Sequence, residues 1–410
     1  MSPKFQSPRG THDVLPADQP LWFDTVVRAM ADVTAAYGYR RIQTPGFEET
    51  ALFQRTAGAG SDIVQKEMYT FTDRSDRSLT LRPEGTAPIC RAYLEHGMQR
   101  DPQPVKLSTF APMYRYSAPQ KGRFREHWQW SVEAIGSADP AVDAEIVQLY
   151  VALLRRVGVR RWELKLNSIG DPSCRPAYVA ELDAWLDAHD DVLDAEARLK
   201  RQTSPLQVFD VKNPEMQAAL AGAPRIGESL CDACREHFAA VRGYLDAYGV
   251  PYTVEPALVR GLDYYSRTTF EFVHDDLGLT FCGGGRYDGL IEQIGGPPTP
   301  GIGFGAGIDR LVLAAQTEGV TAAPRGLDVF FVVDGASRER VLTLMADLRG
   351  QGVACDTDYA GRSFKGQMTQ AGRTGARTIV IARADGAVVR RPGAGEQLVP
   401  LADLAATLRA

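Results

Sequence analysis

The chain has 410 residues, 46 of them basic and 51 acidic, for a formal net charge of −5 at pH 7. At about 100–200 residues per domain, this length predicts two to four domains. No apolar run approaches the roughly 18 residues of a membrane span, and the N-terminus lacks the apolar segment of a signal peptide. We therefore expect a cytoplasmic protein without membrane contact. The charge excludes a wholly basic nucleic-acid coat, but it does not exclude a local basic patch.

The first 140 residues carry signals for one helix and several strands. Apolar residues at helical spacing predict a helix over 21–37, and a strand that ends at Pro45 follows it. Residues 68–82 have the pattern of a hairpin with a polar turn. Further strands are predicted over 106–116 and 126–135. We expect these two strands to pair antiparallel and to be joined by a basic loop.

The middle of the chain is helical and then returns to strands. Residues 173–248 have helical patterns, are acidic at their start and carry few strand signals, which predicts an inserted helical module. Strand patterns return over 252–282. A glycine-rich strand followed by a helix is predicted over 301–316, and residues 317–326 have the composition of a linker.

The C-terminal part alternates between strand and helix patterns, which predicts a compact α/β unit over residues 326–410. This unit contains 11 basic and 9 acidic residues, a net charge of +2, while the rest of the chain carries −7. The tail is therefore the relatively basic part of the protein.

A glycine-rich strand is the first motif that indicates chemistry. The sequence has no P-loop, no HExxH and no GxSxG motif. Residues 301–307 instead place glycine at every second position, so one face of the strand is bare backbone. Such a face lets a ligand lie flat on the sheet, or it reflects close packing under a helix. Arg310 lies in the helix that follows, near the ligand end.

Two polar segments precede that strand. The loop over residues 114–125 carries four cations within eleven residues, which indicates a polyanion site or else a solvated turn. Gln129 and Glu133 are four apart, so they share one face of the following strand, where they fit a small polar ligand or a partly exposed sheet face. Glu84 and Thr86, two apart on an extended segment, suit an ammonium group.

Two further motifs lie closer to the glycine-rich strand. Residues 259–265 read VRGLDYY, and residues 282–288 read CGGGRYD. Three successive glycines indicate either backbone that closely approaches another group or a plain turn.

Together these motifs resemble the histidyl-tRNA synthetase family, which consists of class II aminoacyl-tRNA synthetases, here of bacterial type. The resemblance covers nearly the whole chain and is most specific in RGLDYY and GGGRYD. Motif 1 corresponds to the helix from Leu21 and the strand ending at Pro45, and in the family it forms the homodimer interface. The other matching segments are PRGTHDVLP, KEMYTF, LRPEGTAP, the basic loop as motif 2 and GIGFGAGIDRL as motif 3.

The resemblance implies an α+β fold, namely a class II synthetase antiparallel sheet flanked by helices, with a helical insertion and a C-terminal α/β anticodon-binding domain. The implied boundaries are 1–172 for the first part of the catalytic domain, 173–248 for the insertion, 249–320 for the second catalytic part and 326–410 for the anticodon-binding domain.

The resemblance also implies roles for the histidine-binding residues. One group would hold the α-ammonium, and a second group would bind the imidazole and reject side chains without two ring nitrogens. The ammonium group comprises Glu84, Thr86 and Gln129, and the imidazole group comprises Glu133 and Tyr264, with Tyr265 completing the set.

The same resemblance assigns the ATP site. Arg260 would bridge the histidine carboxylate and the α-phosphate, and Arg115 would contact the same phosphate, which makes these two the catalytic residues. Arg123 and Arg310 would bind the rest of the triphosphate and stack near adenine. His127 occupies the position of the aromatic ring that usually packs on adenine, because the strand here reads FREHWQW where the family reads like FRQFHQ. Mg²⁺ is expected on the β- and γ-phosphates.

Contacts with tRNA are expected from two regions. At the tip of the motif 2 loop, Ser117 and Ala118 stand where an acid and a base are common in the family, so the candidates there are Gln120 and Lys121. In the tail the candidates are Arg362, Lys365, Arg373 and Arg377.

A CxxC pair lies in the helical insertion. Cys231 and Cys234 form half of a zinc site, but His237 is too near in sequence to complete it, and Cys174 is the only other nearby thiol. We therefore expect reduced, buried thiols and no structural zinc or other bound metal.

The implied activity is that of a histidine–tRNA ligase with histidine, ATP and the cognate tRNA as substrates. One alternative is the synthetase-like subunit that activates ATP phosphoribosyltransferase; such paralogues usually lack the tail and have eroded signatures. A tRNA-binding or scaffolding protein is a further alternative.

Overall fold

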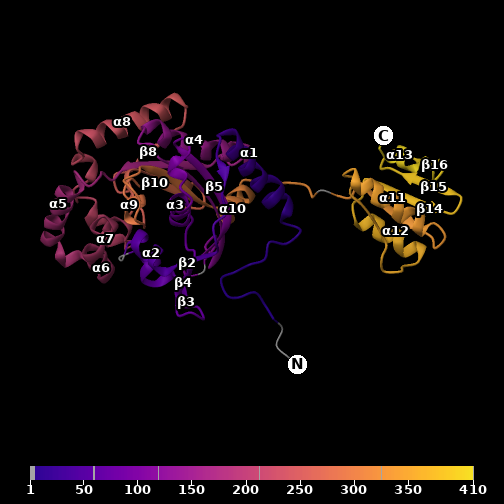
Figure 1. Cartoon of the computed structure of the whole chain (residues 1–410), viewed down its shortest axis with the longest axis horizontal. Helices are drawn as coiled ribbons and strands as arrows, with labels where there is room; N and C mark the ends of the chain where they lie inside the picture. The colour runs from indigo at the N-terminus through magenta and orange to yellow at the C-terminus, as the bar shows by residue number, and fades with distance from the viewer. Residues whose placement is uncertain (1–4, 59–60, 119, 212, 325, 410) are drawn as a thin grey trace. The chain divides into compact units, whose positions relative to one another are not determined.

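The computed structural model describes residues 5–58, 61–118, 120–211, 213–324 and 326–409. The chain divides into two compact units, Met1–Ala322 and Ala323–Ala410, whose elements are labelled in Figure 1. No helix in the described parts of the chain is both long enough and apolar enough to cross a membrane.

An eight-stranded sheet forms the centre of the first unit. Its order is β1-β5-β6-β11-β10-β9-β7-β8. Neighbours from β5 to β7 pair antiparallel, and only the two short edge strands pair parallel. This confirms the predicted antiparallel sheet. The strands are β1 (Arg40–Arg41), β5 (Val105–Tyr114), β6 (Glu126–Ile135), β7 (Trp162–Ser168), β8 (Thr253–Val254), β9 (Ser266–His274), β10 (Leu279–Arg286) and β11 (Gly301–Gly307).

Helix α4 (Pro140–Val157) packs against this sheet. Asp139 caps its first turn by accepting a hydrogen bond from the Ala141 N–H, and the helix ends at a glycine in the left-handed region. Tyr150 of α4 is fully buried, with its ring centroid 4.8 Å from that of Phe272 and 5.3 Å from that of Phe304. Each such side chain contributes roughly 1.5–3 kcal/mol by its burial, so this aromatic cluster helps fix the sheet that carries the site.

The N-terminal helix differs in detail from its prediction. It begins as a π-helical segment, η1 (Pro20–Val27), and continues as α1 (Arg28–Ala36). In the wider turn the Thr25 hydroxyl donates to the Pro20 carbonyl at 2.9 Å. The predicted hairpin is confirmed as β3 (Tyr69–Thr72) and β4 (Ser78–Leu81), and β2 (Phe47–Glu49) adds a third strand to it.

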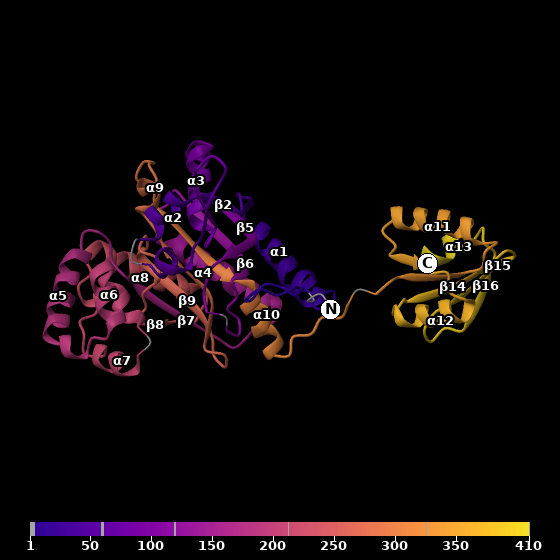
Figure 2. The ribbon, with the colours of Figure 1, turned by 90° about the horizontal axis from the view of Figure 1, so that it is seen from below.

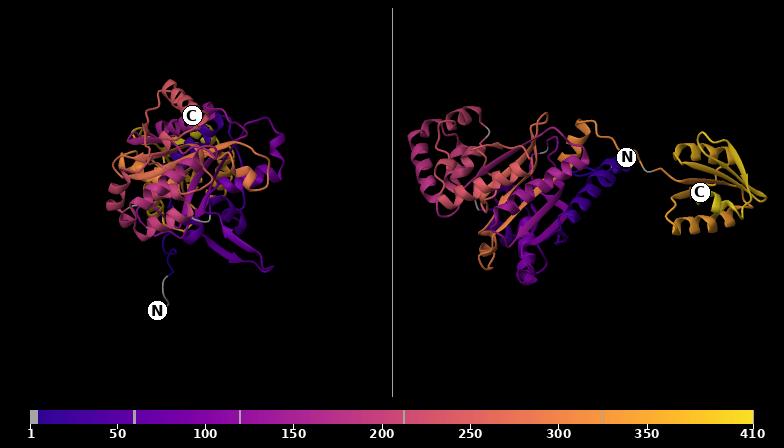
Figure 3. Two further views of the ribbon diagram at one scale, coloured as in Figure 1. Left: turned by 90° about the vertical axis from the view of Figure 1, so that its left-hand side faces the viewer. Right: turned by 90° about the horizontal axis from the view of Figure 1, so that it is seen from above.

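Helices fill the region between β7 and β8, as the sequence predicts. They gather beyond one end of the central sheet (Figure 2 and Figure 3). The helices are α5 (Arg175–Ala188), α6 (Ala195–Thr203), α7 (Pro214–Leu220) and α8 (Asp232–Ala247). The buried apolar residues of α5, α6 and α7 join one cluster with Tyr264, Tyr265 and Tyr287 of the signature motifs, so these three helices pack directly on the part of the chain that bears the motifs. Helix α8 instead contributes Val241 and Leu245 to the core of the central sheet.

The remaining helices of the first unit are short. They include three that border the signature segments and one that follows the glycine-rich strand. They are α2 (Thr50–Ala57), α3 (Thr86–Glu95), α9 (Leu290–Gln293) and α10 (Ile308–Thr317).

The second unit is an α/β layer structure, as predicted. Its sheet order is β13-β12-β14-β15-β16, and β12 is buried on both faces, which explains its uninterrupted apolar sequence VFFVV. Helices α11 and α13 pack on one face and α12 on the other (Figure 2). The elements are β12 (Val329–Val333), α11 (Arg338–Gly350), β13 (Cys355–Thr357), α12 (Phe364–Arg373), β14 (Thr378–Arg383), β15 (Gly386–Arg390), β16 (Glu396–Val399) and α13 (Leu404–Arg409).

The GGGRYD motif connects strand β10 to helix α4 through an ion pair. Its glycines lie within β10, so the alternative of a plain turn is wrong. The guanidinium of Arg286 is fully buried and forms a bidentate ion pair with Asp143 of α4. The Asp143 carboxylate is also fully buried. Asp288 and the Ser137 carbonyl accept the other N–H groups of Arg286 at 3.1 Å and 2.9 Å.

Removing Asp143 leaves the buried charge of Arg286 with the partly exposed Asp288 as its remaining carboxylate partner, and breaking a buried pair in this way costs about 3–5 kcal/mol. We expect Asp143→Ala to lower the free energy of unfolding of the first unit by that amount. Urea denaturation followed by tryptophan fluorescence measures it, because all five Trp residues lie in this unit. The exposed pair of Asp32 and Arg156 provides the control, since Asp32→Ala should cost less than about 1 kcal/mol. Equal losses in the two variants would contradict the prediction.

Candidate active site

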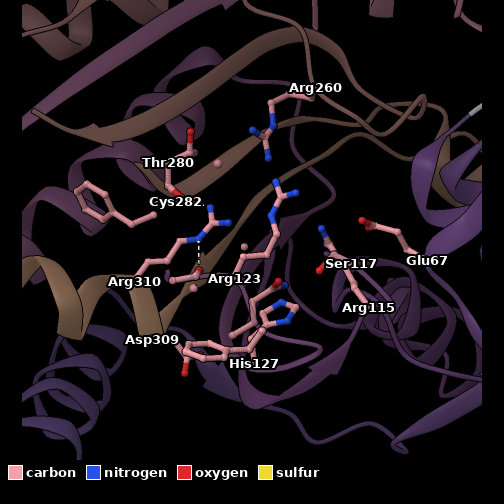
Figure 4. Close-up of a pocket in the computed structure, with 17 residues that line it drawn as sticks. Glu67, Arg115, Ser117, Arg123, His127, Arg260, Thr280, Cys282, Asp309 and Arg310 are labelled. Atoms are coloured by element: carbon pink, nitrogen blue, oxygen red, sulfur yellow. Dashed lines mark hydrogen bonds between the residues drawn. The ribbon is translucent and has the colours of Figure 1, made fainter. Parts of the chain in front are cut away.

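A cavity of about 210 Å³ opens over β6, β10 and β11. The loop between β5 and β6 covers one side of it, and the first turn of α10 and the segment before β9 complete its wall (Figure 4). Charged and polar side chains line it, which suits a charged small molecule. The sequence predicts functional residues in the same strands and in the same loop.

Four arginines from separate parts of the chain line this cavity. Arg115 follows β5, Arg123 lies in the loop, Arg260 precedes β9 and Arg310 lies in α10. Figure 4 shows several of their guanidinium groups pointing into the same space. Burial and then the positive charges of the other three arginines lower the pKa of Arg310 to about 10. A bound polyanion would relieve this repulsion, so the cluster has the chemistry that phosphates require.

Backbone carbonyls and one carboxylate hold the guanidinium groups of Arg115, Arg310 and Arg260 in place. The Nε of Arg115 donates to the Pro83 carbonyl at 2.7 Å. Arg310 donates to the carbonyls of Gly122, at 2.7 Å, and Thr280. Since each contact occupies only part of a guanidinium, further N–H groups remain for a ligand.

Arg260 is held by Glu271 on β9, with which it forms an ion pair. The second carboxylate oxygen of Glu271 accepts a hydrogen bond from the Thr280 hydroxyl at 3.0 Å, so the carboxylate itself is fixed. Sequence reasoning missed Glu271. The alternation of β9 could have indicated it, because Glu271 stands between Phe270 and Phe272, which are fully buried on the opposite face.

Glycines beneath the cavity leave space for side chains of the site. A Cβ at Gly283 would lie 2.5 Å from the Arg260 guanidinium carbon, and one at Gly305 would lie 2.7 Å from the Gln129 amide nitrogen. A Cβ at Gly303 would overlap the Glu133 carboxylate. The bare face of β11 therefore accommodates the polar side chains of β6.

Two buried carboxylates lie beside the cationic cluster. Glu84 accepts hydrogen bonds from the N–H groups of Thr86, at 2.6 Å, and Ala87, at 3.0 Å, at the start of α3. Glu133 accepts from the hydroxyls of Thr86, at 2.7 Å, and Tyr287, at 2.6 Å. Burial raises the pKa of Glu133 to about 8 and also raises that of Glu84. A ligand that brings N–H donors or positive charge would stabilise both carboxylates.

Aromatic and amide side chains complete the neighbourhood of Glu133. Tyr264 and Tyr265 are buried and stack edge to face with their ring centroids 4.7 Å apart. The ring of Tyr264 lies 6.0 Å from that of Tyr287, which donates to Glu133. The amide nitrogen of Gln129 donates to the Ser131 hydroxyl at 3.0 Å. These groups form a buried layer in which polar atoms lie among aromatic rings.

Sequence comparison decides the family. The histidyl-tRNA synthetase family profile matches residues 10–311. The chain belongs to the histidyl-tRNA synthetase family. It is 45% identical over 399 residues to the histidine–tRNA ligase of Desulforamulus reducens, covering 95% of each chain. It is 46% identical over 415 residues to that of Nocardia farcinica, covering 99% of this chain and 98% of the relative.

Solved structures agree with this assignment. The apo histidyl-tRNA synthetase of S. aureus is 36% identical and aligns with a TM-score of 0.84, covering 99% of this chain and 100% of that one. An ATP phosphoribosyltransferase regulatory subunit/histidyl-tRNA synthetase from Bacillus halodurans C is 23% identical with a TM-score of 0.67, covering 93% and 99%, and it shares the fold.

Within the histidyl-tRNA synthetase framework, the expected residues fall into three groups. Arg115, Arg123, His127, Gln129, Arg260 and Arg310 line the cavity. Glu84, Thr86, Glu133, Tyr264 and Tyr265 lie in the buried layer around Glu133. The tRNA candidates are exposed: Gln120 and Lys121 lie in the loop, and Arg362, Lys365, Arg373 and Arg377 lie in the second unit.

A second aromatic ring lies near His127, the residue expected to pack on adenine. Burial and then the charges of Arg115 and Arg310 lower the pKa of His127 to about 3, so its imidazole is neutral. Phe124 also lines the cavity, and its ring centroid lies 4.2 Å from that of His12. Sequence reasoning missed Phe124, although it lies inside the quoted loop.

Two acids in the tail pair with candidate RNA contacts. Arg362 forms an ion pair with Asp358 at 2.5 Å, and Arg377 forms one with Asp328 at 3.3 Å. Helix α12 ends at Arg373, so Arg377 lies in the turn beyond the helix.

The thiols of the insertion lie together. Cys174 and Asp171 are brought next to Cys231 and Cys234, while His237 lies 3.6 Å from the Asp143 carboxylate instead. The sequence predicted no zinc because the thiols and His237 did not make up a complete ligand set. That prediction did not consider Asp171 as a ligand.

The raised pKa of Glu133 predicts how the free energy of unfolding of the first unit depends on pH. Its pKa rises from 4.5 to about 8 on folding, so the folded state retains a proton that the unfolded state loses between these values. The free energy of unfolding therefore falls as the pH rises through that window. We expect Glu133→Gln to remove this loss and to stabilise the first unit by about 2–4 kcal/mol near pH 8, with a much smaller gain near pH 5.

Urea denaturation followed by tryptophan fluorescence at both ends of the window measures this difference. The exposed Glu292→Gln variant is the control and should show no such pH dependence. A gain for Glu133→Gln that is independent of pH would contradict the assigned pKa.

Proposed function

We propose that this cavity activates histidine with ATP and that the chain then transfers histidine to the 3′ end of its cognate tRNA. As a member of the histidyl-tRNA synthetase family, the chain is an aminoacyl-tRNA synthetase, a ligase of class II. The observation that carries the proposal is a cavity lined by four arginines, with two buried carboxylates, Glu84 and Glu133, close to it. Phosphates suit the arginines, and the cationic and N–H groups of histidine suit the carboxylates.

Histidine binds in the buried layer. Glu84, Thr86 and Gln129 receive the α-ammonium group, and Glu133 receives an imidazole N–H. The two hydroxyls that donate to Glu133, from Thr86 and Tyr287, fix its carboxylate. Tyr264 and Tyr265 enclose the ring. A side chain without ring nitrogens would leave buried polar groups unpaired, which is how such a site rejects it.

ATP binds along the arginine cluster. Arg115 and Arg260 contact the α-phosphate, and Arg123 and Arg310 contact the rest of the triphosphate. His127 and Phe124 pack near the adenine. Among the lining residues, Glu67 offers the oxygen donor that Mg²⁺ prefers. Bound Mg²⁺ would neutralise charge on the β- and γ-phosphates.

Activation needs no protein nucleophile. The histidine carboxylate forms a bond to the α-phosphorus, and the bond to the pyrophosphate leaving group breaks. Arg260 stabilises the charge that develops on the phosphoryl oxygens, and Glu271 is its positioning residue. In the second step the ribose hydroxyl at the tRNA 3′ end attacks the activated carbonyl and AMP leaves. Positioning and electrostatics account for the rate.

Each part of the chain has its own role in the reaction. Residues 1–172 and 249–320 form the catalytic domain, 173–248 the insertion that leans over the acceptor arm, and 326–410 the anticodon-binding domain. Gln120 and Lys121 contact the acceptor end. The N-terminal helix and the edge next to β1 form a homodimer interface, and the enzyme works in the cytoplasm.

Histidine-dependent exchange of pyrophosphate into ATP tests this proposal. The purified chain should catalyse it, whereas a regulator of ATP phosphoribosyltransferase or a tRNA scaffold should not. We expect Arg260→Ala to lower the exchange rate by at least about 100-fold, because it removes a fixed charge from the transition state. Arg156→Ala, at an exposed ion pair, should keep full activity. No exchange by the wild type contradicts the function, and near-normal exchange by Arg260→Ala contradicts that residue's role.

The tail makes a separate prediction about tRNA. Replacing Arg373 and Arg377 by alanine together should raise the KM for tRNA by about 3- to 10-fold and reduce its salt dependence, because two phosphate contacts are lost. Pyrophosphate exchange should not change, since it involves no tRNA. Arg340→Ala, an exposed position on α11, is the control. An unchanged KM and salt dependence in the double variant would contradict the assignment.

A further inference from the structure

Three thiols and a carboxylate converge where the helical region leaves and rejoins the sheet. Asp171 and Cys174 lie in the turn between β7 and α5, and Cys231 and Cys234 lie at the start of α8. One ligand atom from each of the four lies within 4.8 Å of all the others. The proposed reaction uses none of these four side chains.

Two of the distances between ligand atoms are close to those of a tetrahedral metal site. The sulfurs of Cys174 and Cys234 are 3.9 Å apart, and an oxygen of Asp171 is 3.8 Å from the Cys174 sulfur. Zinc bonded to sulfur at about 2.3 Å and to oxygen at about 2.0–2.2 Å would place such atoms about 3.5–3.8 Å apart. A disulfide would need its sulfurs about 2.05 Å apart, and all six cysteines are unbonded.

We infer that Asp171, Cys174, Cys231 and Cys234 form a structural zinc site. Thiolate ligands favour zinc among the common divalent ions, and four protein ligands close the coordination sphere, as in structural rather than catalytic sites. Cys174 and Cys234 are buried and Cys231 is half-buried, which shields the metal from water.

Local backbone geometry supports thiolate ligands at both ends of the cluster. Cys231 is the N-cap of α8 and Cys234 lies in its first turn, where the helix dipole stabilises negative charge. On the other side Gly170 has φ +63°, and a Cβ there would lie 2.7 Å from the Cys174 sulfur. Glycine at this position therefore lets the turn bring Cys174 inward.

The carboxylate ligand has the outer hydrogen bonds that metal-binding carboxylates typically have. The N–H of Ser173 donates to one oxygen of Asp171 at 3.0 Å. Arg267, from β9, donates to the other at 3.1 Å. Arg267 also carries positive charge, which offsets part of the negative charge of three thiolates and one carboxylate.

The site joins the two ends of the helical region to the active-site segment. Arg175, next to Cys174, donates to the carbonyl of Tyr265 at 2.8 Å and to that of Gly170 at 3.2 Å. Zinc would thus fix α5 and α8 against each other and against the backbone of the histidine signature. Its role is structural, so its presence does not depend on whether the proposed reaction is correct.

Metal content of the full-length chain tests the inference directly. Protein expressed with added zinc and purified without chelator should contain about one zinc per chain, as measured by elemental mass spectrometry of the acid-digested protein. Cys174→Ser and Cys234→Ser should lose it. Cys355→Ser is the matched control, because Cys355 is a buried thiol of the second unit, and it should retain the metal. Asp171→Cys should retain zinc and resist chelators better, because a fourth thiolate replaces a harder ligand.

Cobalt gives a second readout, independent of the serine variants. Replacing zinc with Co²⁺ in the wild type should produce the absorption of tetrahedral cobalt bound to thiolates, and a strong chelator should remove it and lower the Tm. Three results would overturn the inference: wild-type protein that takes up neither ion, zinc that remains in the Cys234→Ser variant, and a mass two hydrogens lower that shows a disulfide within the cluster.

Discussion

The active site depends on strands β10 and β11, whose glycines leave the face beneath the site without side chains. Glu133 lies across β11 because Gly303 offers no Cβ, and Arg260 lies across β10 because Gly283 offers none. Adding one methyl group at either position would displace a charged group that has little free space around it. This constraint explains why both glycine motifs occur in the middle of strands, where glycine otherwise destabilises a sheet.

Charges of both signs gather around the cavity, and backbone contacts keep them apart. The guanidinium of Arg115 is fixed by the Pro83 carbonyl and the carboxylate of Glu84 by N–H groups of α3, so the two do not neutralise each other by pairing directly. The repulsion within the arginine cluster and the buried state of Glu133 both cost free energy without ligands. Substrates that combine a triphosphate with a cationic amino acid reduce both costs, which makes binding of the pair favourable.

The sequence predicted the elements well because their signals are local. The alternation over 126–135 is β6 residue for residue, and the apolar run VFFVV is the two-sided strand β12. What it missed depends on contacts between distant segments. Glu271 matters only because Arg260 is folded against it. Spacing along the chain likewise gives no measure of how close Asp171 lies to Cys234, since the whole helical region separates them.

The helical region is coupled to the site by more than its shared core. Ser204 and Gln207 donate to the same oxygen of Asp263 at 2.8 Å and 2.7 Å, and Arg175 donates to the Tyr265 carbonyl. The RGLDYY segment is therefore held from two sides by residues of the helical region. Because Arg260 begins that segment, any motion of these helices would be transmitted to the residue assigned to the α-phosphate. A metal that fixes the two ends of the helical region would limit this motion where it matters most for the chemistry.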